Sequence, residues 1–200
     1  MEIYEAAGVH VEAQVWASLL GASADPPEAY DLLEAHLGQR IDRTRIRENR
    51  TRRELEFLAK EDPLPGARSL IESSKEHGLL LAVASSSERS WVVDHLRTHD
   101  LLAAFDAIVC AEDVEHTKPF PDLYLNALRR LGLNAKEAIA FEDSEHGVAA
   151  AKAAGLYCVA VPNRVTECLA FEQADLVVRS LADRDLQAYI HSAQASASPR

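Results

Sequence analysis

The chain has 200 residues, of which 48% are apolar and 26% charged, the proportions of an ordinary soluble protein that can bury a core. Its 21 Lys and Arg are outnumbered by 32 Asp and Glu, and the net charge of −11 excludes general attraction to DNA, RNA or anionic membranes. No run is long and apolar enough to span a bilayer and no secretory leader is recognisable, so the cytoplasm is the expected location.

The first third of the chain is predicted to be all helical. Apolar residues are scattered among polar ones at helical spacing in segments 32–37 and 54–59, and no run resembles a strand. Two prolines and a glycine within residues 62–66 then break helical continuity and predict a hinge. We therefore expect residues 1–62 to form a helical domain of their own.

Between residues 63 and 191, short apolar runs alternate with helical segments. This alternation indicates a parallel sheet covered on both faces, which is a doubly wound α/β core. The Ser- and Ala-rich residues 192–200 are predicted to be a disordered tail. In chain order we expect a helix at 67–76, a strand at 79–84, a helix at 91–96, a strand at 105–110, a helix at 122–131, a strand at 138–141, a helix between Gly147 and Gly155, and strands at 157–161 and 176–178.

Ligands of an open parallel sheet bind at the carboxyl ends of its strands, so the residues that follow each strand are the candidate site. Ser85, Ser86 and Ser87 follow the first strand, where they could offer hydroxyl and backbone N–H donors to a phosphate or could simply cap the next helix. Lys118 stands in Lys-Pro-Phe-Pro-Asp, where two prolines stiffen the backbone. A fixed ammonium suits phosphate, although a solvated surface lysine is equally compatible with this motif alone.

Glu142 and Asp143 follow the next strand. Adjacent carboxylates are costly to bring together unless a cation lies between them, and hard oxygen ligands suit Mg²⁺. Gly147 permits a close backbone approach as a small-residue helix packs on the sheet. We therefore interpret the pair as a Mg²⁺ site in preference to two solvated carboxylates.

These three segments together resemble motifs two, three and four of the haloacid dehalogenase superfamily. The order, the strand context and the small-residue helix all agree, and the chain is most similar to subfamily IA, the β-phosphoglucomutase-like and phosphoglycolate-phosphatase-like hydrolases. The resemblance implies a Rossmann-like core at residues 63–191 with residues 1–62 as its helical cap. It also implies a Mg²⁺-dependent phosphatase or phosphomutase that acts on a small phosphorylated metabolite.

The same resemblance assigns roles to residues. Ser85 and Lys118 would be catalytic, the first by bonding the transferring phosphoryl group and the second by offsetting its charge. Ser86 and Ser87 would bind substrate. Asp143, together with Glu142 directly or through water, would hold Mg²⁺.

The family's first strand ends in Asp-x-Asp, in which one Asp attacks phosphorus and the other acts as general acid and base. Asp25 and Asp31 lie in the helical part and not in such a triplet after an apolar run. The strand that is missing would be central, between the strands that precede Ser85 and Glu142, and its loss would leave unpaired backbone groups in the core. We therefore expect an N-terminally truncated sequence or a start codon assigned too far downstream, rather than a genuinely shortened protein; Met1–Val9 resembles the end of the helix that follows that strand.

Two other functions stay open. A catalytically inactive phosphate-binding protein would keep the phosphate pocket without the nucleophile. A hydrolytic dehalogenase would need no metal, and the Glu142–Asp143 pair speaks against it.

The remaining polar residues give weaker signals. Seven arginines lie between Arg40 and Arg53. One or two of them could clamp a phosphorylated substrate, but a charged helix face of i,i+4 pairs is the commoner outcome. Trp16–Gly21 is similar to the first helices of the family's cap. The eight histidines form no metal-spaced set, and of three unpaired cysteines Cys110 and Cys158 are expected to be buried.

Overall fold

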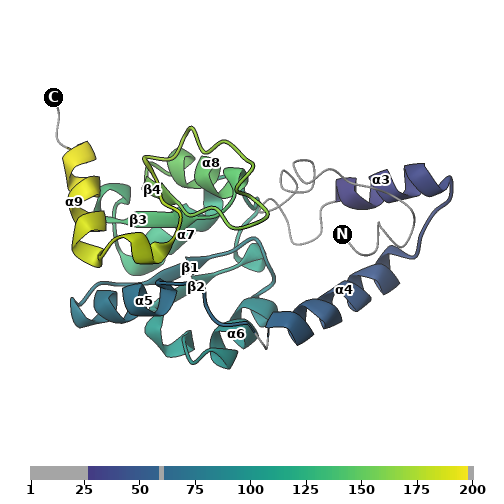
Figure 1. The fold of residues 1–200 in the computed structure, drawn as a ribbon, viewed down its shortest axis with the longest axis horizontal. Coiled ribbons are helices and arrows are strands. Elements are labelled where there is room, and N and C mark those ends of the chain that lie inside the picture. Colours follow the sequence, from purple (N-terminus) through teal and green to yellow (C-terminus); the bar gives the residue numbers. More distant parts are fainter. Residues whose placement is uncertain (1–26, 59–60, 198–200) are drawn as a thin grey trace.

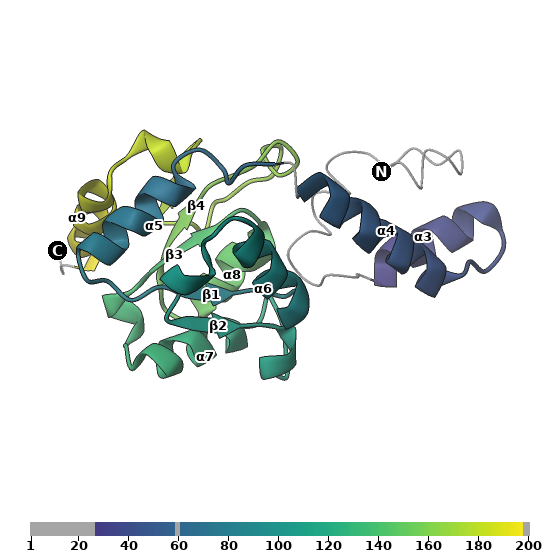
Figure 2. The ribbon, with the colours of Figure 1, turned by 90° about the horizontal axis from the view of Figure 1, so that it is seen from below.

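The computed structural model describes residues 27–58 and 61–197. Two helices, α3 (Pro27–Leu37) and α4 (Arg43–Leu58), extend to one side of an α/β body (Figures 1 and 2). The described part of this helical group contains no strand, as the sequence predicts. Among the described residues, no helix has the length and apolarity that crossing a membrane requires.

Arg43 joins the two helices. Its Nη2 lies 2.6 Å from Asp31 Oδ1 and 2.6 Å from Glu34 Oε2, and its guanidinium carbon lies 5.6 Å from the centre of the Tyr30 ring. The sequence favours i,i+4 pairs along the arginine-rich helix, but Arg43 instead bonds residues nine and twelve positions away. The residue four positions after Arg43 is Arg47, so Arg43 has no acidic i,i+4 partner within α4 and bonds the carboxylates of α3 instead.

This contact predicts an acid-sensitive helix pair. The hydrogen bond from Arg43, aided by the backbone N–H of Ile41, lowers the pKa of Glu34 from 4.5 to about 2. A carboxyl whose pKa is lower in the folded state stabilises that state above its unfolded pKa and loses this contribution as pH falls through the folded pKa. We therefore expect amide hydrogen exchange in α3, corrected for the intrinsic pH dependence, to accelerate as pH falls from about 4.5 toward 2. Glu34→Gln should lack this acceleration, and equal pH dependence in both proteins would contradict the assignment.

The α/β body begins with α5, and its helices and strands alternate along the chain. Its elements are α5 (Ala67–Glu76), β1 (Ala82–Ala84), α6 (Arg89–Thr98), β2 (Ala107–Val109), α7 (Asp122–Leu131), β3 (Ile139–Glu142), α8 (Glu145–Ala153), β4 (Tyr157–Ala160), β5 (Leu176–Val177) and α9 (Leu186–Ala197), with 3-10 turns at Leu102–Ala104, Ala111–Asp113, Ala135–Glu137 and Leu181–Asp183.

Most of these elements match the prediction. The bounds of α5 and α7 are those expected, and every predicted strand exists, although four strands are shorter than predicted and β3 is shifted by one residue toward the C-terminus. The expected start of α8 is wrong, because the helix begins at Glu145 rather than after Gly147. Ser144 is its N-cap, and the Ser144 hydroxyl accepts a hydrogen bond of 3.1 Å from the Gly147 N–H.

Helices cover both faces of the parallel strands, which confirms the doubly wound α/β fold. The alternation of β4 shows this directly, since successive side chains of a strand point to opposite faces. Cys158 and Ala160 pack with α7 and α8, whereas Val159 packs on the other face with Leu70 of α5 and Tyr189 of α9.

The five strands form two separate sheets in the described residues. One has the order β1-β2 and the other β3-β4-β5, and all pairs are parallel. A single doubly wound sheet would need a further strand between β1 and β3, where the sequence analysis places the family's first strand. Whether the whole chain lacks it stays a prediction, because Met1–Val9, Trp16–Gly21 and Asp25 lie outside the described residues.

Gly66 forms the turn that leads into α5. Its φ of 87° lies in the left-handed region, and a Cβ built on it would lie 2.3 Å from the backbone nitrogen of Ala182. Ser180 Oγ donates a 3.1 Å hydrogen bond to the carbonyl of Pro65 and so holds the same two segments together. The predicted hinge residue is therefore packed against the turn after β5.

Gly66→Ala is expected to destabilise the fold by about 2 kcal/mol, because it combines an unfavourable φ with a collision against backbone. Urea denaturation measures the change. Gly78→Ala is the matched control: its φ is 71° and nothing lies within 4 Å of the added Cβ. If both variants lost the same stability, the contact with Ala182 would be unimportant.

The expected disordered tail is wrong for residues 192–197, because α9 continues to Ala197. Ser192 Oγ donates a 2.9 Å hydrogen bond to the carbonyl of Ala188, and Arg184 Nη1 donates to Ser192 Oγ at 3.1 Å. The alanines of this segment are strong helix formers, so a composition that resembles a linker here extends a docked helix.

Candidate active site

The serine turn Ser85–Ser87 follows β1, as predicted. Ser85 N–H continues the sheet by bonding the carbonyl of Val109 at 2.9 Å, and Ser85 Oγ accepts a 3.1 Å hydrogen bond from Ser87 N–H. The Ser87 carbonyl accepts from Ala111 N–H at 3.1 Å. The turn is therefore tied to the segment that follows β2.

Lys118 comes from that neighbouring segment and joins the serine turn to β3. Its backbone N–H lies 3.4 Å from Ser86 Oγ, and its Nζ lies 2.5 Å from Glu142 Oε1. The lysine side chain is 10% exposed and the glutamate side chain 4%. The interpretation of Lys118 as a solvated surface lysine is therefore wrong, and three predicted site residues, Ser86, Lys118 and Glu142, meet at the carboxyl ends of β1, β2 and β3.

Tyr124 is a further residue of this cluster, which no motif in the sequence singles out within the helix expected at 122–131. Its hydroxyl donates to Glu142 Oε1, and Lys118 Nζ lies 5.4 Å from the centre of its ring. Burial, followed by the charge of Glu142, raises the pKa of Tyr124 well above its usual value, so the phenol stays a donor. The sequence signal that could have identified Tyr124 is its position on the buried face of a helix, because a buried phenol needs a polar partner for its hydroxyl.

Asp143 lies beside this cluster but points elsewhere. It is exposed, and its Oδ2 accepts a 2.9 Å hydrogen bond from Asn163 Nδ2 in the loop after β4. The carboxylates of Glu142 and Asp143 thus have different partners, although both residues lie at the end of β3.

Gly147 allows the glutamate to occupy its position. A Cβ on Gly147 would lie 1.8 Å from Glu142 Oε2. The close approach that the sequence analysis expects at this glycine is therefore made by the side chain of Glu142.

The residues present do not by themselves fit a Mg²⁺ ion. Within residues 27–58 and 61–197, no group of three or more His, Cys, Asp or Glu side chains is placed to hold a metal. Glu142 is held by Lys118 and Tyr124, and Asp143 by Asn163. Mg²⁺ is held by carboxylates that converge on it, and these two carboxylates bond different partners instead.

The sequence contains one Asp-x-Asp triplet, Asp183-Arg184-Asp185, which lies after β5. Asp183 Oδ2 accepts from the backbone N–H groups of Arg179 and Ser180, at 3.0 and 3.1 Å, and Asp185 Oδ1 accepts from Ala188 N–H at 2.8 Å. Both carboxylates cap backbone, so this triplet does not take the place of the nucleophile.

The expectation about the two cysteines has a clear outcome. Cys110 and Cys158 are free and buried, as predicted, and burial raises the pKa of the Cys158 thiol to about 12. His116 Nδ1 lies 3.4 Å from Asp122 Oδ2 on the surface, and nothing in this contact gives it a chemical role.

The chain is similar to a protein-family model, to curated relatives and to solved structures. The family model described as haloacid dehalogenase-like hydrolase matches residues 28–161. Of curated relatives, the protein named "Putative phosphatase YhcW" of Bacillus subtilis (strain 168) is 37% identical over 185 residues, 92% of this chain and 84% of that protein.

Two solved structures are also similar to this chain. CbbY from Rhodobacter sphaeroides in complex with xylulose-1,5-bisphosphate is 30% identical with a TM-score of 0.72, covering 91% of this chain and 85% of that one. The β-phosphoglucomutase of Clostridium difficile has a TM-score of 0.78 over 98% of this chain and 87% of that one; at 21% identity it shows the fold alone.

Proposed function

Because the chain belongs to the haloacid dehalogenase-like hydrolase family, we propose that it supplies the phosphoryl-binding site of a phosphatase or phosphomutase acting on a small phosphorylated metabolite. The observation that carries this proposal is the meeting of Ser86, Lys118 and Glu142 at three strand ends. The phosphate and sugar bisphosphate in structures of CbbY support this substrate class.

In this proposal each described group has a separate task. The hydroxyls of Ser85, Ser86 and Ser87 donate hydrogen bonds to the phosphoryl oxygens, and Lys118 neutralises the phosphoryl charge. Residues 63–197 form the core, in which α9 ends at Ala197, and residues 1–62 form the cap that covers it. The cap helices α3 and α4 would then select the metabolite.

The nucleophilic aspartate is proposed to come from a strand outside the described residues, placed between β1 and β3. Such a strand would pair with both open strand edges and would bring a carboxylate to Lys118. That carboxylate would join Asp143 and Glu142 in holding Mg²⁺, the ion we propose as cofactor.

Phosphate release from p-nitrophenyl phosphate with Mg²⁺ tests this proposal. We expect no activity above background in the 200-residue chain, and activity in a chain extended by an in-frame upstream segment that encodes an apolar run and Asp-x-Asp. Activity of the 200-residue chain itself would overturn the proposed source of the nucleophile.

A second candidate function is a catalytically inactive phosphate-binding protein. The pairing of Lys118 with Glu142 favours it, because within the described residues the lysine forms its ion pair with this glutamate rather than with an aspartate nucleophile. Phosphate binding without activity in the extended chain would support this alternative.

A further inference from the structure

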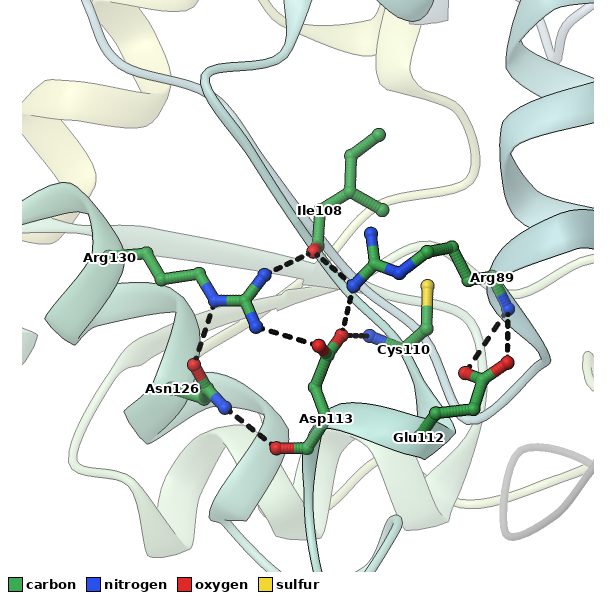
Figure 3. Close-up of polar contacts among 7 residues, drawn as sticks. All are labelled: Arg89, Ile108, Cys110, Glu112, Asp113, Asn126 and Arg130. Carbon is green, nitrogen blue, oxygen red and sulfur yellow. Dashed lines mark hydrogen bonds and ion pairs between the residues drawn. The ribbon is translucent and has the colours of Figure 1, made fainter.

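A second polar cluster lies beside the serine turn and is centred on Asp113, at the end of the 3-10 turn after β2. Arg89 from the first turn of α6 and Arg130 from the end of α7 reach its carboxylate from opposite sides (Figure 3). Arg130 Nη2 lies 2.7 Å from Asp113 Oδ1, Arg89 Nη2 donates to Oδ2, and Cys110 N–H donates to the same Oδ2 at 2.8 Å. The carboxylate therefore has charged or backbone partners on both oxygens.

The two arginines also share the carbonyl of Ile108. Arg130 Nη1 and Arg89 Nη2 lie 2.8 and 3.1 Å from this oxygen. Ile108 alternates with Ala107 and Val109, whose backbone groups face β1, so its carbonyl lies on the open edge of β2. An unpaired carbonyl at a strand edge needs donors, and the two guanidinium groups supply them.

Arg89 and Arg130 belong to different helices, and only Arg89 lies next to the serine turn in the chain. It follows the serine turn by two residues, and its own backbone N–H donates to Glu112 Oε1 at 2.9 Å. The turn before it carries the donors that the proposed function assigns to phosphate. Arg130 instead lies at the far end of α7, where its Nε donates to Asn126 Oδ1 at 3.0 Å.

The direction of the Asp113 pKa shift is consistent with a tightly held cluster. Burial would raise the pKa of Asp113, but the Cys110 N–H and the hydrogen bond and charges of the two arginines outweigh it and lower the pKa. The carboxylate therefore stays ionised, and each arginine keeps a charged partner that shortens and strengthens its hydrogen bond.

We propose that Arg89 and Asp113 are positioning residues, which hold the first turn of α6 against β2 and thereby fix the Ser85–Ser87 turn for binding a phosphoryl group. This inference rests on the proposed function for its ligand. Arg130 bonds the same two acceptors, Asp113 and the Ile108 carbonyl, but it belongs to α7 and holds that helix in place. The cluster thus acts on the serine turn through one of its two arginines.

Hydrogen exchange on the full chain tests the positioning without any ligand. In Arg89→Gln we expect amides of residues 85–92 to exchange about tenfold faster or more, since a charged hydrogen bond that holds the turn is lost. In Arg130→Gln, which loses the same two acceptors, exchange in this segment should stay within about twofold of the wild type and rise in α7 instead. Equal effects of the two variants on residues 85–92, or no effect, would overturn the proposal. If Arg89→Gln does not fold, Arg89→Lys, which keeps the charge but not the fork of donors, serves in the same comparison.

Inorganic phosphate then tests the functional consequence by calorimetric titration of folded wild type and variants. We expect Arg89→Gln to weaken phosphate binding about tenfold and Arg130→Gln to leave it within about twofold. Equal weakening by both would mean that the cluster is only structural and would overturn the inference. A wild type that binds no phosphate would contradict the proposed function, while the exchange comparison would still decide the positioning.

Discussion

Replacing Lys118 by methionine is expected to destabilise the protein by about 3–5 kcal/mol, because it leaves the Glu142 carboxylate buried without its counter-charge. The two side chains are 10% and 4% exposed. Methionine fills a similar volume, so the loss reports the charge rather than a cavity. Urea denaturation monitored by circular dichroism measures it.

A matched control is Lys152→Met. Lys152 Nζ also lies 2.5 Å from a carboxylate oxygen, that of Asp175, but these side chains are 30% and 22% exposed. Water stabilises the carboxylate that remains, so the expected loss is about 1 kcal/mol or less. Adding Glu142→Gln to Lys118→Met should recover more than half of the loss. Equal losses in the two lysine variants would show that burial of the Lys118 pair does not matter.

Replacing Gly147 by alanine is expected to destabilise the protein by about 3 kcal/mol. In an exposed helix this change would stabilise by about 0.5–1 kcal/mol, so the sign is itself informative. The added Cβ would lie 1.8 Å from Glu142 Oε2. Glu142 cannot move away cheaply, because Lys118 and Tyr124 hold its other oxygen.

A double-mutant cycle identifies the cause of that loss. Glu142→Asp shortens the side chain by one methylene and withdraws the carboxylate from Gly147, so Gly147→Ala should cost at least about 1 kcal/mol less in this background. Thermal or urea unfolding of the four proteins gives the coupling. Additive effects would place the strain of Gly147→Ala somewhere other than at Glu142.

The sequence determined the features that depend on near neighbours in the chain. Local apolar periods, prolines, glycines and caps predict the helix at 122–131 and the order of the strands along the chain. They also place the three motifs at the ends of strands. Because parallel strands place their carboxyl ends along one edge, this local information also predicted that the segments carrying Lys118 and Glu142 belong to one site.

Only the tertiary structure decided which partner each polar group has. Tyr124 and Lys118 reach Glu142 across 18 and 24 positions, Arg89 reaches Asp113 across 24, and Arg43 turns to α3 rather than along its own helix. Several partners were compatible with each of these side chains in the sequence. The packing of helices on the strands brought one of them within hydrogen-bonding distance, and that choice made Lys118 a buried counter-ion and placed Arg89 against the serine turn.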